Sequence, residues 1–234
     1  MIGHIFSIIF FQPLLNLLVF GYHFIPDVGV VIVLTTVIIR LLLAPTMHSS
    51  LKSQGQMTAL QPKMNEIREK FKNDKEAQAK AMMNLYKEHS INPLSSCLPV
   101  LIQLPFLIAL YEVFIRILRA GDITKDLYPF IHNPGTFNPL FLHLLNLAQP
   151  SFVLGLVAGA AQYLQSRMLM PKEGSSDPTQ KALQVQTLYI FPALTVFISL
   201  RLPAGLPLYW IVTTLFGVAQ QYYIMKKSKV DVSK

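Results

Sequence analysis

The chain of 234 residues is 52% hydrophobic and 14% charged, and its mean hydropathy is +0.43. This is too apolar for an ordinary soluble domain of its length, so the sequence predicts an all-α polytopic membrane protein. The net charge of +8 does not by itself indicate a nucleic-acid ligand, because in a membrane protein the position of the charges matters more than their sum. The lone cysteine, Cys97, excludes an internal disulfide and a cysteine metal cluster.

Residues 1–27 are apolar and aromatic and contain no Lys or Arg. A secretory signal would carry a positively charged region and a cleavage site of small residues, and neither is present. Gln12, Pro13 and Asn16 interrupt the apolar run. We expect an amphipathic helix that lies in the outer interface of the membrane that the chain spans. The alternative is an additional span, because the run is long enough to cross the bilayer.

Residues 28–45 are the first predicted transmembrane helix, an apolar run that contains a single arginine, Arg40. A guanidinium inside a span costs about 2.5 to 3.5 kcal/mol on insertion scales. Arg40 therefore needs water, a partner or a function.

Residues 46–93 form the one extended polar region, where we expect a cytosolic helical hairpin. Apolar residues spaced by three and four make one stripe of its first arm: Met57, Leu60, Met64, Ile67 and Phe71. Pro62 should kink or restart this arm. Asn73 and Glu76 predict a capping box for a second helix over about 76–89. Packing within the hairpin explains the stripe, and a docking surface for a partner is the alternative.

The second predicted transmembrane helix covers residues 94–119 and is followed by an outer loop at 120–150. Pro99 and Pro105 loosen backbone hydrogen bonding in its first half, which membrane helices tolerate. Near its far end Glu112 and Arg116 lie one turn apart. We expect an ion pair between them, with a relay site as the alternative.

Three further spans are predicted at residues 151–170, 184–202 and 207–225. The first of them contains closely spaced Gly and Ala residues that let helices approach one another. A cytosolic linker at residues 171–183 precedes the fourth span, and residues 226–234 form a cytosolic tail. Five spans are therefore expected in total.

The distribution of Lys and Arg predicts the orientation. The hairpin, the linker with its flank and the tail carry most of the 20 basic residues, whereas the other side carries only Arg116, Arg119, Lys125 and Arg201. By the positive-inside rule the hairpin, the linker and the C-terminus are cytoplasmic and the N-terminus is outside. Six spans would place the uncharged N-terminus inside, against the rule.

This orientation places Arg40 in the inner half of the bilayer, five residues before Pro45 at the cytoplasmic boundary. Thr36 lies one turn deeper on the same face. Polar groups of other spans could converge on Arg40: Gln103, Gln162, Trp210, Thr213 and Thr214. Because no acidic residue is expected in the inner half of another span, the sequence favours a water-filled cavity open to the inner side. The alternative is that Arg40 snorkels to inner-leaflet phosphates.

Four segments in a fixed order carry a family resemblance: VIIRLLLAP, LQPKMNEIREKF, NPLSSCLPVLIQLPFLIALY and GLPLYWIVTTLFGVAQQYYIMKK. With them the chain resembles the YidC/Oxa/Alb membrane protein insertases over about residues 10–227. The resemblance implies five core helices around a hydrophilic groove that is open to the cytosol and to lipid and closed on the outer side. It implies that Arg40 is the groove arginine and that Thr36, Gln162 and Trp210 lie along the groove.

The implied function is insertion and folding of newly made membrane proteins in the bacterial plasma membrane, without bond-making. The partners would be nascent membrane proteins and the lipid bilayer, with the ribosome and a Sec translocon as further candidates and no direct recognition of nucleic acid. We expect no cofactor, metal or catalytic residue, and no phosphate-binding glycine loop is present. A small-solute transporter and a membrane assembly scaffold are the alternatives, although a transporter typically shows inverted repeats and buried acid–base pairs.

The chain also departs from some family patterns. We expect no large extracytoplasmic domain and no lipoprotein-type signal cysteine. The tail after Lys227 is short, which puts tail-mediated ribosome binding in doubt, whereas the hairpin and the linker could make weaker contacts.

Overall fold

The computed structural model describes residues 2–92, 98–118, 123–170 and 178–231, and these are mainly helical. In chain order the elements are α1 (Ile2–Phe6), η1 (Ser7–Phe11), α2 (Gln12–Phe24), α3 (Val28–Ala59), α4 (Gln61–Lys70), α5 (Lys75–Glu88), α6 (Leu98–Leu118), η3 (Thr124–Asp126), β1 (Leu140–Phe141), β2 (Leu145–Asn146), α7 (Phe152–Leu169), α8 (Pro178–Val185), η4 (Gln186–Ile190), α9 (Phe191–Ser199) and α10 (Gly205–Asp231). The prediction of a mostly helical membrane protein is confirmed.

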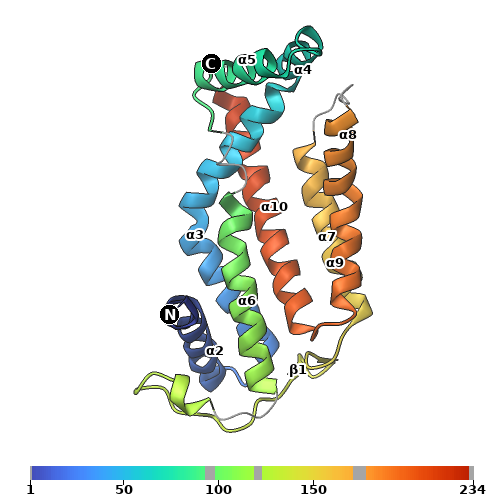
Figure 1. Cartoon of the computed structure of the whole chain (residues 1–234). Helices are drawn as coiled ribbons and strands as arrows, with labels where there is room; N and C mark the ends of the chain where they lie inside the picture. The colour runs from blue at the N-terminus through green and yellow to red at the C-terminus, as the bar shows by residue number, and fades with distance from the viewer. Residues whose placement is uncertain (1, 93–97, 119–122, 171–177, 232–234) are drawn as a thin grey trace.

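Three helical stretches of the described chain are long and apolar enough to cross a membrane: Gly3–Phe24, Val28–Ala59 and Lys181–Ser199. In Figure 1 the long helices lie side by side, with the α4–α5 hairpin at one end and the β1 loop at the other. The end of α10 and the start of α8 lie at the hairpin end.

The N-terminal segment is one nearly continuous helix from α1 through η1 to α2. Figure 1 draws α2 foreshortened beside the full length of α6, so its axis is inclined to that of the bundle. One face of this helix, which includes Leu15 and Val19, packs into the main hydrophobic core with α3 and α6. Because Gly3–Phe24 also meets the length and composition of a span, its position in the outer interface stays a prediction.

Helix α3 continues from the first apolar run into the polar region without a break. Asp27 caps its N-terminus by accepting a hydrogen bond from the Val30 amide at 3.0 Å. Pro45, the expected inner boundary of the span, lies inside the helix and does not end it. Beside it, the Gln220 amide of α10 donates to the Ala44 carbonyl at 2.9 Å and fastens α10 to this part of α3.

The hairpin has the expected helices with a different cap. Pro62 lies in the first turn of α4, so the expected restart of the first arm is confirmed. The capping box at Asn73 is wrong: Asp74 has the extended backbone of an N-cap and accepts a hydrogen bond from the Ala77 amide at 2.9 Å. The cap lies one residue later than predicted because α5 begins at Lys75.

Apolar side chains of the two arms pack against each other within the hairpin. Leu60, Met64, Leu85 and Ile91 form a small buried cluster, and Met57, Ile67, Met82 and Tyr86 pack around it. The expected stripe is thus largely covered by the hairpin itself.

Helices α7 and α9 pack closely through glycine, as the small residues of α7 predicted. A Cβ atom on Gly159 would lie 2.5 Å from Val196 Cγ2, and one on Gly155 would lie 2.8 Å from Ser199 Cβ. In Figure 1 these two helices form a pair on the far side of α10 from α3 and α6.

Candidate functional site

Arg40 links its own helix, α3, to α6 and α10. Its Nη2 donates to the Gln103 side-chain oxygen of α6 at 2.8 Å, and its Nε donates to the Thr213 hydroxyl of α10 at 3.4 Å. The Gln103 amide in turn donates to the Tyr209 hydroxyl. We call Arg40, Gln103, Tyr209 and Thr213 the Arg40 cluster. The side chains that bind the Arg40 guanidinium are neutral, and the Arg40 side chain is partly exposed.

Tyr209 is a member of the cluster that the sequence interpretation missed. It precedes Trp210 and lies four residues before Thr213, so both side chains share one face of α10. Helical periodicity applied to α10 would have placed Tyr209 beside Thr213. Tyr209 is almost completely buried, and its hydroxyl accepts a hydrogen bond from the Gln103 side-chain amide.

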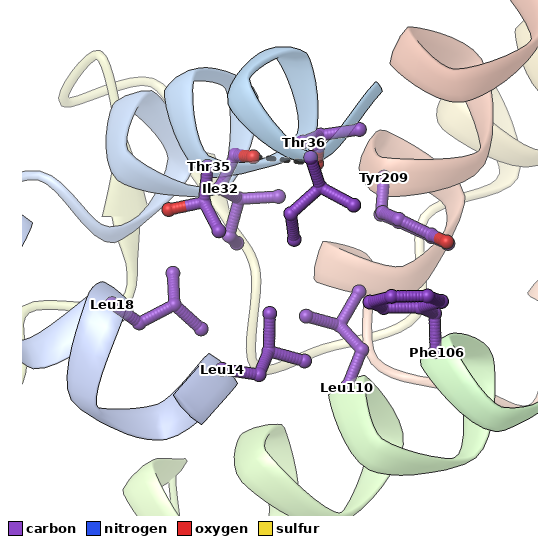
Figure 2. Close-up of a pocket in the computed structure, with 9 residues that line it drawn as sticks. Leu14, Leu18, Ile32, Thr35, Thr36, Phe106, Leu110 and Tyr209 are labelled. Carbon is purple, nitrogen blue, oxygen red and sulfur yellow. Dashed lines mark hydrogen bonds between the residues drawn. The ribbon is translucent and has the colours of Figure 1, made fainter. Parts of the chain in front are cut away.

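Thr36 lies next to the cluster and makes a hydrogen bond within its own helix. Its hydroxyl donates to the Ile32 carbonyl at 2.6 Å. Figure 2 shows Thr35 and Thr36 with Tyr209 around a cavity of about 10 Å³, otherwise lined by apolar side chains. A void of that size holds about one water molecule at most.

Gln162 and Trp210 lie elsewhere. Gln162 of α7 accepts a hydrogen bond from the Thr195 hydroxyl of α9. Trp210 faces a different helix pair, α6 and α9. Among the residues that the structure describes, no hydrogen bond joins either side chain to Arg40.

An open apolar cleft of about 290 Å³ lies between α6, α9 and α10. The side chains that form its walls include Leu107, Ile108, Tyr111, Ile198, Leu202 and Trp210. Trp210 is the neighbour of Tyr209 in α10, so this cleft and the Arg40 cluster lie along the same helix. The two features differ in chemistry: the cleft is apolar, and the Arg40 cluster carries a partly exposed cation.

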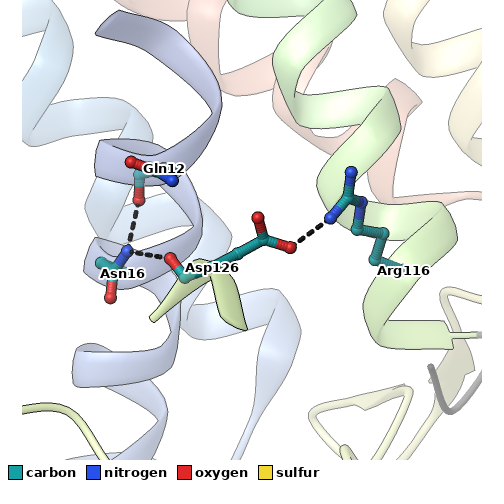
Figure 3. A network of polar contacts seen from close by, with 4 residues as sticks. All are labelled: Gln12, Asn16, Arg116 and Asp126. Carbon is teal, nitrogen blue, oxygen red and sulfur yellow. Dashed lines mark hydrogen bonds and ion pairs between the residues drawn. The ribbon is translucent and has the colours of Figure 1, made fainter. Parts of the chain in front are cut away.

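At the end of the bundle opposite the α4–α5 hairpin, a polar network ties the N-terminal helix to the loop after α6 (Figure 3). The Asn16 amide donates to the Gln12 carbonyl at 2.7 Å and to the Asp126 carbonyl at 3.0 Å, and its oxygen accepts from the Tyr128 amide at 2.7 Å. The Asp126 carboxylate pairs with Arg116.

The prediction that Arg116 pairs with Glu112 is wrong, because its acidic partner is Asp126. Arg116 pairs with Asp126 of η3, whose carboxylate points toward the Arg116 guanidinium of α6 (Figure 3). Its guanidinium carbon also lies 4.4 Å from the centre of the Phe11 ring, within the range of a cation–π contact.

Three further hydrogen bonds hold the same loop at this end of the bundle. The backbone amide of Asn138 donates to the Tyr22 hydroxyl at 2.8 Å, and the backbone amide of Leu142 donates to the Asp27 carboxylate at 2.7 Å. The Ala204 amide, between α9 and α10, donates to the Gln149 carbonyl at 3.0 Å. The loop is therefore attached to α2, to the start of α3 and to the start of α10.

Comparison with known proteins gives the class of this membrane protein. A family model described as "60Kd inner membrane protein" matches residues 20–231, so the chain belongs to that family. A membrane protein insertase YidC of Fusobacterium nucleatum is 37% identical, over 87% of this chain and 89% of the relative. The insertase YidC of Geobacter sulfurreducens is 35% identical over 95% of this chain and 38% of the relative. The resemblance found in the sequence is confirmed.

The chain spans little more than a third of several curated relatives that it matches, including the insertase YidC of Geotalea daltonii at 37% of the relative. A solved structure entitled "Active YidC insertase crystal structure with the first transmembrane domain resolved" is also similar. Its TM-score is 0.61 at 28% identity, over 91% of this chain and 45% of that one.

Proposed function

We propose that this protein inserts newly made membrane proteins into the bacterial plasma membrane and helps them fold. The observation that carries the proposal is Arg40, a cation inside an apolar helix that is held by neutral side chains of α6 and α10. The relatives named membrane protein insertases support the same function.

The proposed topology has five core spans: the apolar half of α3, then α6, α7, the continuous α8–α9 helix and α10. The hairpin, the 171–183 linker and the C-terminus face the cytoplasm, and the N-terminal helix lies at the outer interface. The concentration of Lys and Arg in these polar segments supports this orientation. So does Figure 1, in which the hairpin, the start of α8 and the end of α10 lie at one end.

The guanidinium has hydrogen-bonding capacity left for a substrate. A guanidinium carries five N–H donors, and the bonds to Gln103 and Thr213 use one on Nη2 and one on Nε. No ion pair within the described ranges neutralises it. Water entering from the cytoplasm would solvate the other donors, and an acidic segment of a substrate can replace that water. The bonds to Gln103 and Thr213 also direct the side chain into the bundle, which speaks against simple snorkelling to lipid phosphates.

In the proposed mechanism the substrate's short polar segment enters a hydrated groove beside Arg40, so that less apolar thickness remains to be crossed. Its hydrophobic segment follows the cleft that Trp210 lines and then enters lipid, where burial of about 20 apolar residues supplies the driving force. An inside-negative potential favours outward movement of acidic residues by about 2.3 kcal/mol per charge per 100 mV. Gln162, between α7 and α9, would line the wall of the groove that lies across from Arg40.

The outer loop would keep the groove closed toward the outside. Its attachments to α2, α3 and α10 lie at the end opposite the hairpin. A seal at that end forces the polar segment to enter from the cytoplasm and to leave only when the loop yields.

The test is insertion of a single-span protein with an acidic outer tail into vesicles that contain Arg40→Ala, Arg40→Lys or the parent protein. Two unit charges about 4 Å apart attract by about 1 kcal/mol in water and by more inside a protein, so Arg40→Ala should slow insertion about fivefold or more. Arg40→Lys keeps the charge and should retain much of the rate.

The same substrate with a neutral tail is the control, because its insertion should depend little on Arg40. Equal rates for the parent and Arg40→Ala with the acidic tail would contradict the role of the charge. If vesicles with the parent protein insert neither substrate, the insertase function itself is wrong.

A further inference from the structure

The outer loop carries a short hairpin whose tip has an unusual backbone. Leu140 pairs with Asn146 and Phe141 pairs with Leu145. In the loop between the strands, Leu142 has a φ of 50° and His143 a φ of 60°. This left-handed region is uncommon for residues with side chains and is most unusual for a large residue such as leucine.

The end of the first strand and the turn residue after it are fixed to the start of α3 through Phe141 and Leu142. The Asp27 carboxylate accepts the Leu142 amide at 2.7 Å through one oxygen while its other oxygen caps α3. The Phe141 ring covers Gly29, where a Cβ atom would lie 2.2 Å from the ring. The direction in which the tip points is therefore set by α3.

The tip presents leucine side chains outward. Leu144 is 87% exposed and Leu142 is 56% exposed. A polar residue would fill such exposed positions without loss of packing, so exposed leucines on a fixed tip indicate an apolar surface that meets something.

The position of the tip identifies what it meets. The apolar run of α3 begins at Val28, directly after the Asp27 that holds the tip, so the leucines lie level with the start of the hydrocarbon region. Phe24, which ends α2 three residues before Asp27, is 72% exposed and stacks edge-on with Phe20. Exposed apolar side chains therefore occur both at the tip, which Asp27 holds, and three residues before Asp27 in the chain.

We propose that Leu142 and Leu144 insert into the outer leaflet of the bilayer and anchor the outer loop to the lipid surface. The inference rests on the proposed orientation and spans. Anchoring at the tip holds the loop at a constant depth in the outer leaflet. A substrate that leaves the groove must then move the loop sideways, along the membrane surface. The occupant is lipid, because Asp27 fixes the exposed leucines at the residue after which the proposed first span begins.

The experiment uses the full-length chain with Cys97→Ser and a single new cysteine, labelled with the environment-sensitive fluorophore NBD. The protein is reconstituted into vesicles of phosphatidylethanolamine and phosphatidylglycerol, with or without lipids that carry a shallow nitroxide quencher. Leu144→Cys is the reporter, and Leu142→Cys is a second reporter in case the first label disturbs the tip. Thr136→Cys, exposed on the same loop, is the control in water, and Leu34→Cys, exposed on α3, is the control in lipid.

The proposal predicts blue-shifted emission at position 144 or 142, quenching by the shallow nitroxide lipid, and protection from aqueous iodide, whereas the label at 136 shows none of these. Red-shifted emission and iodide quenching at both 142 and 144, with Leu34→Cys in lipid, would overturn the anchor and leave the proposed spans intact. A label at 34 that is in water would overturn the proposed first span and, with it, the anchor.

Discussion

Asn16 is a nearly completely buried amide on an otherwise apolar face of α2, and all of its hydrogen-bonding groups meet the loop after α6 or its own helix. Burial of such a group is favourable only when its partners are in place. Its removal would leave the Tyr128 amide and the Asp126 carbonyl without their side-chain partner. Asn16 therefore couples the N-terminal helix to the outer loop.

Replacing Asn16 with alanine should lower the free energy of unfolding by about 1 to 3 kcal/mol, the cost of leaving buried polar groups unpaired. The measurement is thermal unfolding in detergent, together with protease cleavage of the loop at 123–150, which should become faster. Gln12→Ala is the matched control, since only the backbone carbonyl of Gln12 takes part in the network. Equal losses in the two variants would show that Asn16 is not the coupling residue.

The second arm of the α4–α5 hairpin begins at a capped N-terminus. Helix α5 has 14 residues, so it is too short to be stable in isolation, and its buried side chain is Leu85 near the far end. The Asp74 carboxylate satisfies the Ala77 amide, which has no partner within the helix. The start of α5 should therefore be the point at which the hairpin opens first.

Asp74→Ala should destabilise the start of α5 by about 1 kcal/mol, within the range of 0.5 to 2 kcal/mol known for N-caps. Hydrogen exchange should accelerate at the amides of residues 75–78 and change little in α4. Asn73→Ala is the control, and it should leave this exchange close to that of the parent. Faster exchange in Asn73→Ala than in Asp74→Ala would show that Asn73, the residue predicted from the sequence, is the N-cap of α5.

Local signals in the sequence predicted the helices well and the partners of long polar side chains less well. Pro62 marked the restart of the hairpin arm, and the glycines of α7 marked the close approach to α9. The partner of Arg116 was missed because helical spacing offers Glu112, whereas Asp126 arrives through a loop whose path no local pattern encodes.

The candidate site was predictable to the extent that polar residues stand out in apolar runs. Gln103 and Thr213 were singled out in this way, and both contact Arg40. Gln162 was singled out by the same signal, yet it bonds with Thr195 of α9, the helix against which α7 packs closely through its glycines. Which spans are neighbours depends on packing of the whole bundle, and polarity alone does not determine it.

At the level of the entire molecule, the proposed function needs a cation, an apolar cleft and a closed outer loop along one path from cytoplasm to lipid. Tyr209, which belongs to the Arg40 cluster, and Trp210, which lines the cleft, are successive residues of α10. In the proposed function one substrate contacts both surfaces. A protein that only stabilised assembled complexes would not need such a path.

The most direct test of this claim is site-specific photo-crosslinking to a stalled nascent chain whose single hydrophobic segment has just left the ribosome. A photoreactive residue replaces Gln103 or Trp210 in the path, or Leu194 on the exposed side of α9 as a control. The account predicts adducts with the substrate's polar segment from position 103, adducts with its hydrophobic segment from position 210, and few from position 194. Adducts from 194 alone, or none from 103 and 210, would contradict it.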